Sequence, residues 1–351
     1  MNAVAVADAS TARTVVPPWV AVVGRYKRPE TWRATWQLTS TVLLYFVGLT
    51  AGYLALDVGY WLTLLIAIPT GGLVTRLFVL QHDCGHGSLF PSKRVNETVG
   101  KWLGVLTFSP FEFWRKSHAI HHATSGDLAR RGTGDVNTLT IREYEALSPW
   151  GKRGYWLYRH PLVLFGVFPM LLFGFRFRMA YRPEPAWHKE YWSVYRTNIF
   201  IALFALLACV TVGWRAWFAV QVPVLWVAAT VGVWLFYVQH QYEATYWAQP
   251  EDWDYYRASI QGSSNLRLSK PFQWFTANIG VHHVHHLCPA IPNYHLQRCH
   301  REIPEMHLAK DLGVREALGA AFLTLWDEEQ QRLISFREHR RRRAAAAVAT
   351  A

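Results

Sequence analysis

The sequence predicts an all-α integral membrane protein in which four transmembrane helices form two hairpins and a cytosolic helical cap carries clustered histidines. Three observations support this fold class. Hydrophobic residues make up 51% of the 351 residues and charged residues only 17%, whereas soluble domains have about 25% charged residues. Four apolar stretches have the length that a bilayer-crossing helix needs. Nine of the 16 histidines fall in three short clusters.

The same composition excludes other classes of protein. A disordered chain would lack this many apolar residues. Four cysteines are too few for a disulfide scaffold of this length, and they form no CxxC pair, so a thiolate zinc or iron–sulfur site is not expected. Low charge combined with 18 tryptophans is typical of a membrane protein rather than of an ordinary soluble enzyme.

The predicted spans cover residues 37–56, 58–80, 198–212 and 217–239. Asp57, Gly59 and Tyr60 form the turn of the first hairpin, and Gly213–Arg215 form the turn of the second. A fifth apolar stretch, residues 162–175, is short and interrupted by Pro169, so an interfacial or re-entrant segment is expected there. Residues 99–108 are predicted to form a helix lying on the membrane.

The chain divides into three predicted parts. Residues 1–33 form a flexible lead, which is not a signal peptide. Residues 34–335 form the membrane domain, with polar histidine-rich regions at 81–195 and 240–335. Residues 336–351 form a basic, alanine-rich tail, interpreted as a solvated end near a membrane surface. Nucleic-acid binding was the minor alternative for this tail, and no nucleic-acid partner is expected.

Basic residues predict the orientation in the membrane. They gather in the connection between the hairpins, at Lys93, Arg94, Lys101, Arg115, Lys116, Arg130, Arg131, Lys152, Arg153, Arg176 and Arg178. The two hairpin turns carry only Asp57 and Arg215. By the positive-inside rule, both termini and the histidine clusters face the cytoplasm.

The histidine clusters have helical spacing. Within each cluster the members are three or four residues apart or adjacent: His82 and His86; His118, His121 and His122; His282, His285 and His286. On an α-helix these offsets place imidazoles on one face. Neutral imidazoles that converge on one point form a transition-metal site. His283 lies one residue off the pattern, so we expect it outside the ligand set or at the surface.

The topology permits one shared site. Two predicted spans separate the second cluster from the third, so both emerge on one membrane face if residues 162–175 do not cross the bilayer. His240 directly follows the fourth span, and from position alone it is either a ligand or a membrane-interface histidine. The remaining histidines lack ligand spacing; among them, His295 and His300 follow the third cluster closely and are candidates for outer partners.

A histidine that binds metal usually donates its other ring N–H to a carboxylate or carbonyl group. The candidate partners near the clusters are Asp83, Glu112, Asp127, Asp135, Glu243 and Asn278. Asn278 would lie on the same helical face as His282 because it precedes it by four residues. Asp83 is expected to point away from its neighbour His82, toward another cluster.

Three longer strings carry a family resemblance: HDCGHGSLF, HAIHHATSGDL with GTGDVNTLT, and HHVHHLCPAIPNYHLQ. They resemble the integral membrane fatty acid desaturases with three histidine boxes, near the bacterial acyl-lipid delta-12 and omega-3 branch. The resemblance covers residues 46–300. It departs from the plant pattern at Gly87, where plant relatives carry a second histidine, and the chain has no motif of a fused haem domain.

The resemblance implies a centre of two non-haem irons with O2 as co-substrate. The implied ligands are His82, His86, His118, His121, His122, His282, His285 and His286, with His240 as the additional ligand before the last box. It also implies an acyl-lipid or other fatty-acyl substrate, a multi-pass location in a bacterial inner membrane, and an external electron donor of the ferredoxin or cytochrome-b type. The reaction would introduce a cis double bond.

Two alternatives stay open at this point. A hydroxylase or ketolase acting on lipid, alkane or carotenoid would use the same metal site but retain oxygen in its product. A metal transporter would need ionisable residues inside the spans, where they are nearly absent. Regioselective chemistry on an acyl chain requires an apolar tunnel; its candidate lining residues are Phe113, Trp114, Trp234, Phe236 and Trp274.

Overall fold

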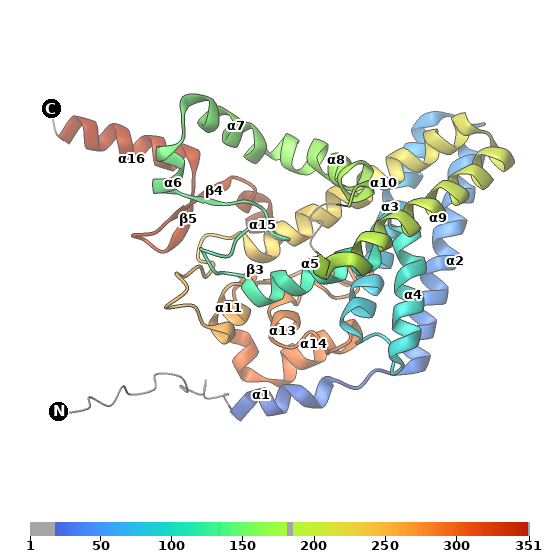
Figure 1. Cartoon of the computed structure of the whole chain (residues 1–351), viewed down its shortest axis with the longest axis horizontal. Helices are drawn as coiled ribbons and strands as arrows, with labels where there is room; N and C mark the ends of the chain where they lie inside the picture. The colour runs from blue at the N-terminus through green and yellow to red at the C-terminus, as the bar shows by residue number, and fades with distance from the viewer. Residues whose placement is uncertain (1–17, 133, 181–184, 350–351) are drawn as a thin grey trace.

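Four long helices dominate the computed structural model, which describes residues 18–132, 134–180 and 185–349 (Figure 1). They are α2 (Thr31–Ala55), α3 (Tyr60–His86), α9 (His188–Val212) and α10 (Trp214–His240), and each is long and apolar enough to cross a membrane. The two hairpin turns lie together at the upper right of Figure 1. The predicted arrangement of four spans in two hairpins is therefore confirmed.

The helices are longer than the apolar stretches that predicted them. Helix α9 begins at His188, well before the predicted start at 198, and α3 continues past residue 80 to His86. Hydropathy marks only the part of a helix that is suited to lipid, whereas the hydrogen-bonded backbone continues into polar surroundings. As a result, the histidines that follow the second and fourth spans belong to the span helices themselves.

Helix α3 is the centre of the bundle because it packs against both α2 and α10. Tyr45, Leu77 and Val224 are buried between these helices. A Cβ at Gly71 would lie 2.9 Å from the carbonyl oxygen of Val224, so glycine permits the close approach of α10. Large apolar side chains on the outer faces of the four helices remain exposed, as expected for surfaces that contact lipid.

Shorter helices form the cap at the polar end of the bundle. These are α1 (Pro18–Val23), α4 (Lys93–Leu106), α5 (Phe111–Thr124), α6 (Ile141–Ala146), α7 (Pro149–Arg159), α8 (Phe168–Gly174), α11 (Tyr255–Gln261), α12 (Lys270–Phe275), α13 (His282–Leu287), α14 (Asn293–Glu302), α15 (Val314–Ala320) and α16 (Phe336–Ala349). Helices α4 and α5 pack against α3 and α9, which places the second histidine cluster beside the first.

Two small sheets accompany the helices, and neither was predicted from the sequence. Strand β1 (Leu139–Thr140) runs parallel to β4 (Leu323–Asp327), which pairs with β5 (Arg332–Ser335) in an antiparallel hairpin. Strands β2 (Asn265–Leu266) and β3 (Asp311–Leu312) form a parallel pair. Only the β4–β5 hairpin has a readable signal, two apolar runs around a polar turn. The other strands are too short for any periodicity.

Residues 162–175 form an irregular helix instead of a straight span. A π-helical segment (Leu162–Val167) leads into α8, and the helix over Leu162–Arg178 is bent by 59° relative to α7. Arg159, before the segment, bonds the hydroxyl group of Tyr237 near the end of α10. Arg178, after it, bonds the carbonyl oxygen of Phe108 in the cap. Both ends therefore lie at the cap end of the bundle, as a re-entrant or interfacial segment requires.

The predicted lead and tail are only partly described. Residues 1–17 of the lead lie outside the described residues, while Val23 at the end of α1 is buried against the third histidine region. Helix α16 of the tail packs Phe336 against Tyr144 and Tyr155. The boundaries of the three parts remain predictions.

Candidate metal centre

The first histidine cluster lies at the polar end of α3. His82 and His86 are one helical turn apart, and Gly87 ends the helix with a φ of 70°. This left-handed conformation suits glycine at a helix C-terminus, since any other residue would be strained there. The conformation gives a local physical reason for a glycine at position 87.

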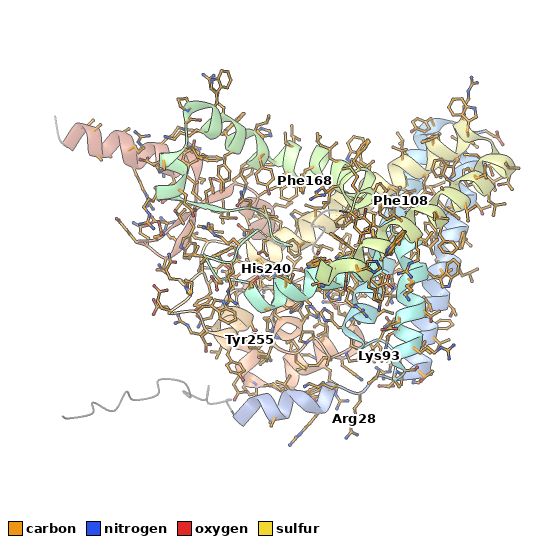
Figure 2. The ribbon with its side chains drawn as sticks, viewed as in Figure 1. Arg28, Lys93, Phe108, Phe168, His240 and Tyr255 are labelled. Atoms are coloured by element: carbon orange, nitrogen blue, oxygen red, sulfur yellow. The ribbon has the colours of Figure 1, made fainter. Side chains whose placement is uncertain are left out.

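The other histidines reach the same place from three further elements. Helix α5 supplies His118, His121 and His122, and the short helix α13 supplies His282, His285 and His286. His240 is the last residue of α10, and Figure 2 labels it near the centre of the molecule. All nine candidate residues are therefore brought together, although their positions in the chain range from 82 to 286.

The nine imidazoles form two groups, within each of which the candidate ligand atoms all lie within 4.8 Å of one another. The five-histidine group contains His82, His86, His118, His122 and His285. The four-histidine group contains His121, His240, His282 and His286. Each group could hold one metal ion, and the second and third clusters contribute to both groups.

The rings in both groups turn their Nε2 atoms toward one another. In the five-histidine group, Nε2 of His285 lies 3.0 Å from Nε2 of His82 and 2.9 Å from that of His122. In the four-histidine group, Nε2 of His240 lies 3.2 Å from Nε2 of His121 and 3.0 Å from that of His282. Nitrogens bound to one small cation at about 2.1 Å have neighbours at such separations.

The hydrogen-bond partners of the Nδ1 atoms determine which ring nitrogen carries the proton, and therefore whether Nε2 has a free lone pair. Nδ1 of His121 donates to the carboxylate of Asp135 at 2.5 Å, and Nδ1 of His240 donates to the carbonyl oxygen of Gly262 at 3.0 Å. In the neutral ring the proton then sits on Nδ1, which leaves a lone pair on Nε2. Two lone pairs facing each other at 3.2 Å repel, and no hydrogen bond can form between them. A cation shared by both rings removes that repulsion, so the donor set fits a bound metal.

Burial favours the neutral form of several imidazoles in the cluster. It lowers the pKa of the His118, His122 and His285 imidazoles well below the ordinary value of 6.5, and the neighbouring imidazoles lower these pKa values further. A neutral imidazole has the free lone pair that a metal ligand needs. Nε2 of His86 and of His286 are also buried without a hydrogen-bond partner among the described residues, as expected for atoms aimed at an ion.

Two of the candidate outer partners reach the cluster. Asp135 binds His121, as described above. Asp83 accepts a bond from Nδ1 of His82 at 3.2 Å and accepts further bonds from the backbone N–H and side chain of Asn293. The expectation that Asp83 points away from its neighbour was therefore wrong. Its two oxygens instead tie the first cluster to α14.

The other candidate outer partners lie elsewhere. Asn278 was expected on the helical face of His282, but α13 begins only at His282, and the Asn278 side chain donates to the carbonyl oxygen of Asn293. Glu112 pairs with Lys101, Asp127 with Arg130, and Glu243 with Arg332. The carbonyl group of Gly262 was missed because no sequence pattern marks a backbone acceptor.

The remaining open histidines lie outside the two groups. His283 is buried and its Nε2 lies 3.1 Å from Nδ1 of His300, so it is not a surface residue. His295 pairs with Glu30 at 3.1 Å.

Two of the predicted tunnel residues contact the cluster. The Trp114 ring stacks on His118 with 4.6 Å between centroids, and Phe236 lies 5.0 Å from His121. Phe113 packs against Trp187, and Trp274 lies under the guanidinium group of Arg76. Trp114 and Phe236 therefore shield the cluster from solvent, whereas Phe113 and Trp274 pack elsewhere.

The Asp135–His121 contact gives a testable prediction. We expect Asp135→Ala to lower metal affinity and activity by about 10- to 100-fold, because the imidazole loses the acceptor that fixes its tautomer and orientation. Asp135→Asn, which keeps an acceptor oxygen without charge, should have a smaller effect. Metal titration followed by turnover measurement tests this. Asp57→Ala, at the exposed hairpin turn, is the control, and equal behaviour of Asp135→Ala and the control would contradict the role.

The bundle and its cluster define a membrane protein with a histidine-rich site for two metal ions. The family model described as Fatty acid desaturase matches residues 59–317. The chain belongs to the fatty acid desaturase family and is accordingly an oxidoreductase.

Individual relatives agree with this assignment. A fatty acid desaturase of Bacillus subtilis is 40% identical over 90% of this chain and 89% of its own length. A chloroplastic omega-6 fatty acid desaturase of Glycine max is 25% identical over 85% of this chain and 68% of its own. An endoplasmic-reticulum omega-3 fatty acid desaturase of Vigna radiata is 27% identical over 64% of this chain and 60% of its own.

Proposed function

We propose that the protein is a membrane acyl-lipid desaturase that uses two non-haem irons and O2 to introduce a cis double bond. The proposed ligands are the nine histidines of the two groups. The observation that carries the proposal is the convergence of their Nε2 atoms into two adjacent sets. The proposed source of electrons is an external donor of the ferredoxin or cytochrome-b type, as the resemblance to the family implies.

The chain's own residues would prepare this chemistry. The nine histidines would hold two irons, which would supply the oxidising power of O2 for removing two hydrogens from neighbouring methylenes. The two substrate electrons and two donor electrons, with two further protons, reduce O2 to two water molecules. Neutral imidazoles bind the metal without adding negative charge, while Asp83 and Asp135 orient His82 and His121. Trp114 and Phe236 exclude water from the rings.

The proposed location is a bacterial inner membrane with the metal site and both termini in the cytoplasm. The basic residues between the hairpins support this orientation. Within α3, Arg76 is the exception to the scarcity of ionisable side chains in the spans. It is buried, donates to Thr41 at 3.0 Å and to the carbonyl oxygen of Trp274, and lies on the cap side. A tie between helix and cap explains this cation better than a transport path.

The fatty-acid profile of a host expressing the gene tests the reaction. We expect new cis-monounsaturated or more unsaturated acyl chains with wild-type protein and none with His285→Ala at equal membrane abundance. Mass analysis separates the loss of two hydrogens from the gain of oxygen. A product that retains oxygen would contradict desaturation and favour the hydroxylase alternative.

A further inference from the structure

A small cavity touches the four-histidine group directly. Its volume is about 10 Å³, and His240, Asp135, Val136, Phe236 and Trp247 are among its lining residues. This volume holds about one water molecule. The cavity therefore borders the candidate ligand His240 and also Asp135, the partner of His121. In this conformation it is too small for a larger molecule.

A much larger cavity lies beyond the end of α10. Its volume is about 600 Å³, and it is formed by the loop after α10, by α11 and by the β4–β5 hairpin. Trp247 lines both cavities, so this residue lies where the two cavities come together. The volume falls in the range of about 300–1,000 Å³ typical of ligand sites.

The backbone around Trp247 is fixed against the segment that follows the second histidine cluster. The N–H of Leu128 donates to the carbonyl oxygen of Ala248, and the N–H of Ala248 donates to that of Gly126, both at 2.9 Å. Gly126 has a φ of 78°, and a Cβ there would lie 2.9 Å from the carbonyl oxygen of Tyr246. The glycine thus permits the close contact that holds Trp247 beside the metal centre.

The large cavity offers donors for a polar ligand. Trp326 is only 1% exposed, yet its Nε1–H has no partner among the described residues. A buried donor of this kind usually meets an acceptor from water or a ligand. Arg257 also lines the cavity, with its guanidinium group 4.9 Å from the ring of Tyr246. The small cavity includes the apolar side chains of Val136 and Phe236 in its lining, and the Phe236 ring lies 5.0 Å from that of His121.

We propose that the large cavity binds the carbonyl-bearing polar end of the acyl substrate, and that the chain passes Trp247 to reach the histidine groups. This inference rests on the proposed desaturase function. Because the small cavity holds only about one water molecule, the Trp247 side chain must turn aside to admit the methylenes. The polar end is then held by Trp326 and Arg257, and the distance from that end sets which methylenes reach the centre.

The first test measures occupancy without turnover. Ala244 is exposed and lines the cavity, so Ala244→Cys supplies a thiol for a maleimide reagent, with wild-type protein giving the background of native thiols. We expect protection by dipalmitoyl phosphatidylethanolamine in nanodiscs or by palmitoyl-coenzyme A, and the protecting arm identifies the source of the acyl group. Hexadecane, which lacks a polar end, should not protect. Protection by neither acyl compound, or equal protection by hexadecane, would overturn the proposal.

The second test uses Trp326→Phe, which removes the N–H but keeps an aromatic ring. We expect KM for the protecting substrate to rise about 2- to 10-fold, as for one lost hydrogen bond. The kcat and the iron content should be unchanged. Trp150→Phe, on the exposed face of α7, is the matched control. An unchanged KM in Trp326→Phe would contradict the assignment.

The two tests separate this proposal from the desaturase function. Thiol protection needs neither iron nor an electron donor, so it can succeed where no double bond is formed. Conversely, normal desaturation in the host with no protection at Ala244→Cys overturns only the proposed binding site.

Discussion

His86→Ala, His121→Ala and His285→Ala are each expected to abolish desaturation, with product at least about 100-fold below wild type. His86 and His285 belong to the five-histidine group, and His121 belongs to the four-histidine group. Since the proposed reaction needs a metal ion in each group, loss of a ligand in either group should have the same effect. Acyl products in membranes from expressing cells, normalised to the amount of protein, provide the measurement.

The control is His307→Ala, since His307 is exposed and outside both groups. It should retain wild-type activity and membrane abundance. The three variants should also insert normally, because their side chains lie at the cap end of the bundle. Activity near wild type in any one of them would contradict its place among the ligands.

Arg159→Met is expected to destabilise the fold by about 3 kcal/mol or more. The buried guanidinium group donates to the carbonyl oxygens of Asn137 and Leu323 at 2.9 Å and to the hydroxyl group of Tyr237 at 2.9 Å. It therefore ties α7 to α10 and to the β1–β4–β5 sheet. Methionine keeps the apolar bulk but supplies no donor, so each of these acceptors loses a hydrogen bond, although the Leu323 carbonyl oxygen still accepts from the Tyr237 hydroxyl group. Thermal unfolding in detergent should show a Tm lower by about 5–10 °C.

The matched control is Arg153→Met on the same helix. Arg153 is exposed and lies over Trp150, so its loss should shift the Tm by no more than about 1 °C. Arg159→Lys should fall between the two, since a lysine can make only some of the bonds. Equal Tm values for Arg159→Met and Arg153→Met would show that the buried network does not stabilise the fold.

The four-helix bundle could be predicted because each of its helices is marked by a continuous apolar stretch of sequence. A stretch such as residues 58–80 is apolar along nearly its whole length, with Arg76 as its one charged side chain, and a bilayer-crossing helix needs little beyond such a stretch. The ends of the helices could not be predicted in the same way, because α9 continues through polar residues such as Lys189 and Glu190. The short strands β1 and β2 depend on distant partners, which no local pattern reveals.

The histidines could be predicted as a set, but their grouping could not. His121 and His122 are adjacent in sequence, but neighbouring side chains on a helix point in directions about 100° apart, and the two rings join different groups. Which group each ring joins depends on how α5 lies against α10 and α13. The outer partners could not be chosen from the sequence either. Asp135 and Asn278 were both candidates, but the tertiary fold brings Asp135 to His121 and directs Asn278 to the carbonyl oxygen of Asn293.

The iron content of the purified protein tests the central claim most directly. Elemental analysis by mass spectrometry should find about two irons per chain in wild type, because each group offers enough imidazoles for one ion. His121→Ala should lose the ion of the four-histidine group and retain about one. Wild-type protein that is active and contains no iron, or a His121→Ala variant that retains both irons, would contradict the two-group centre.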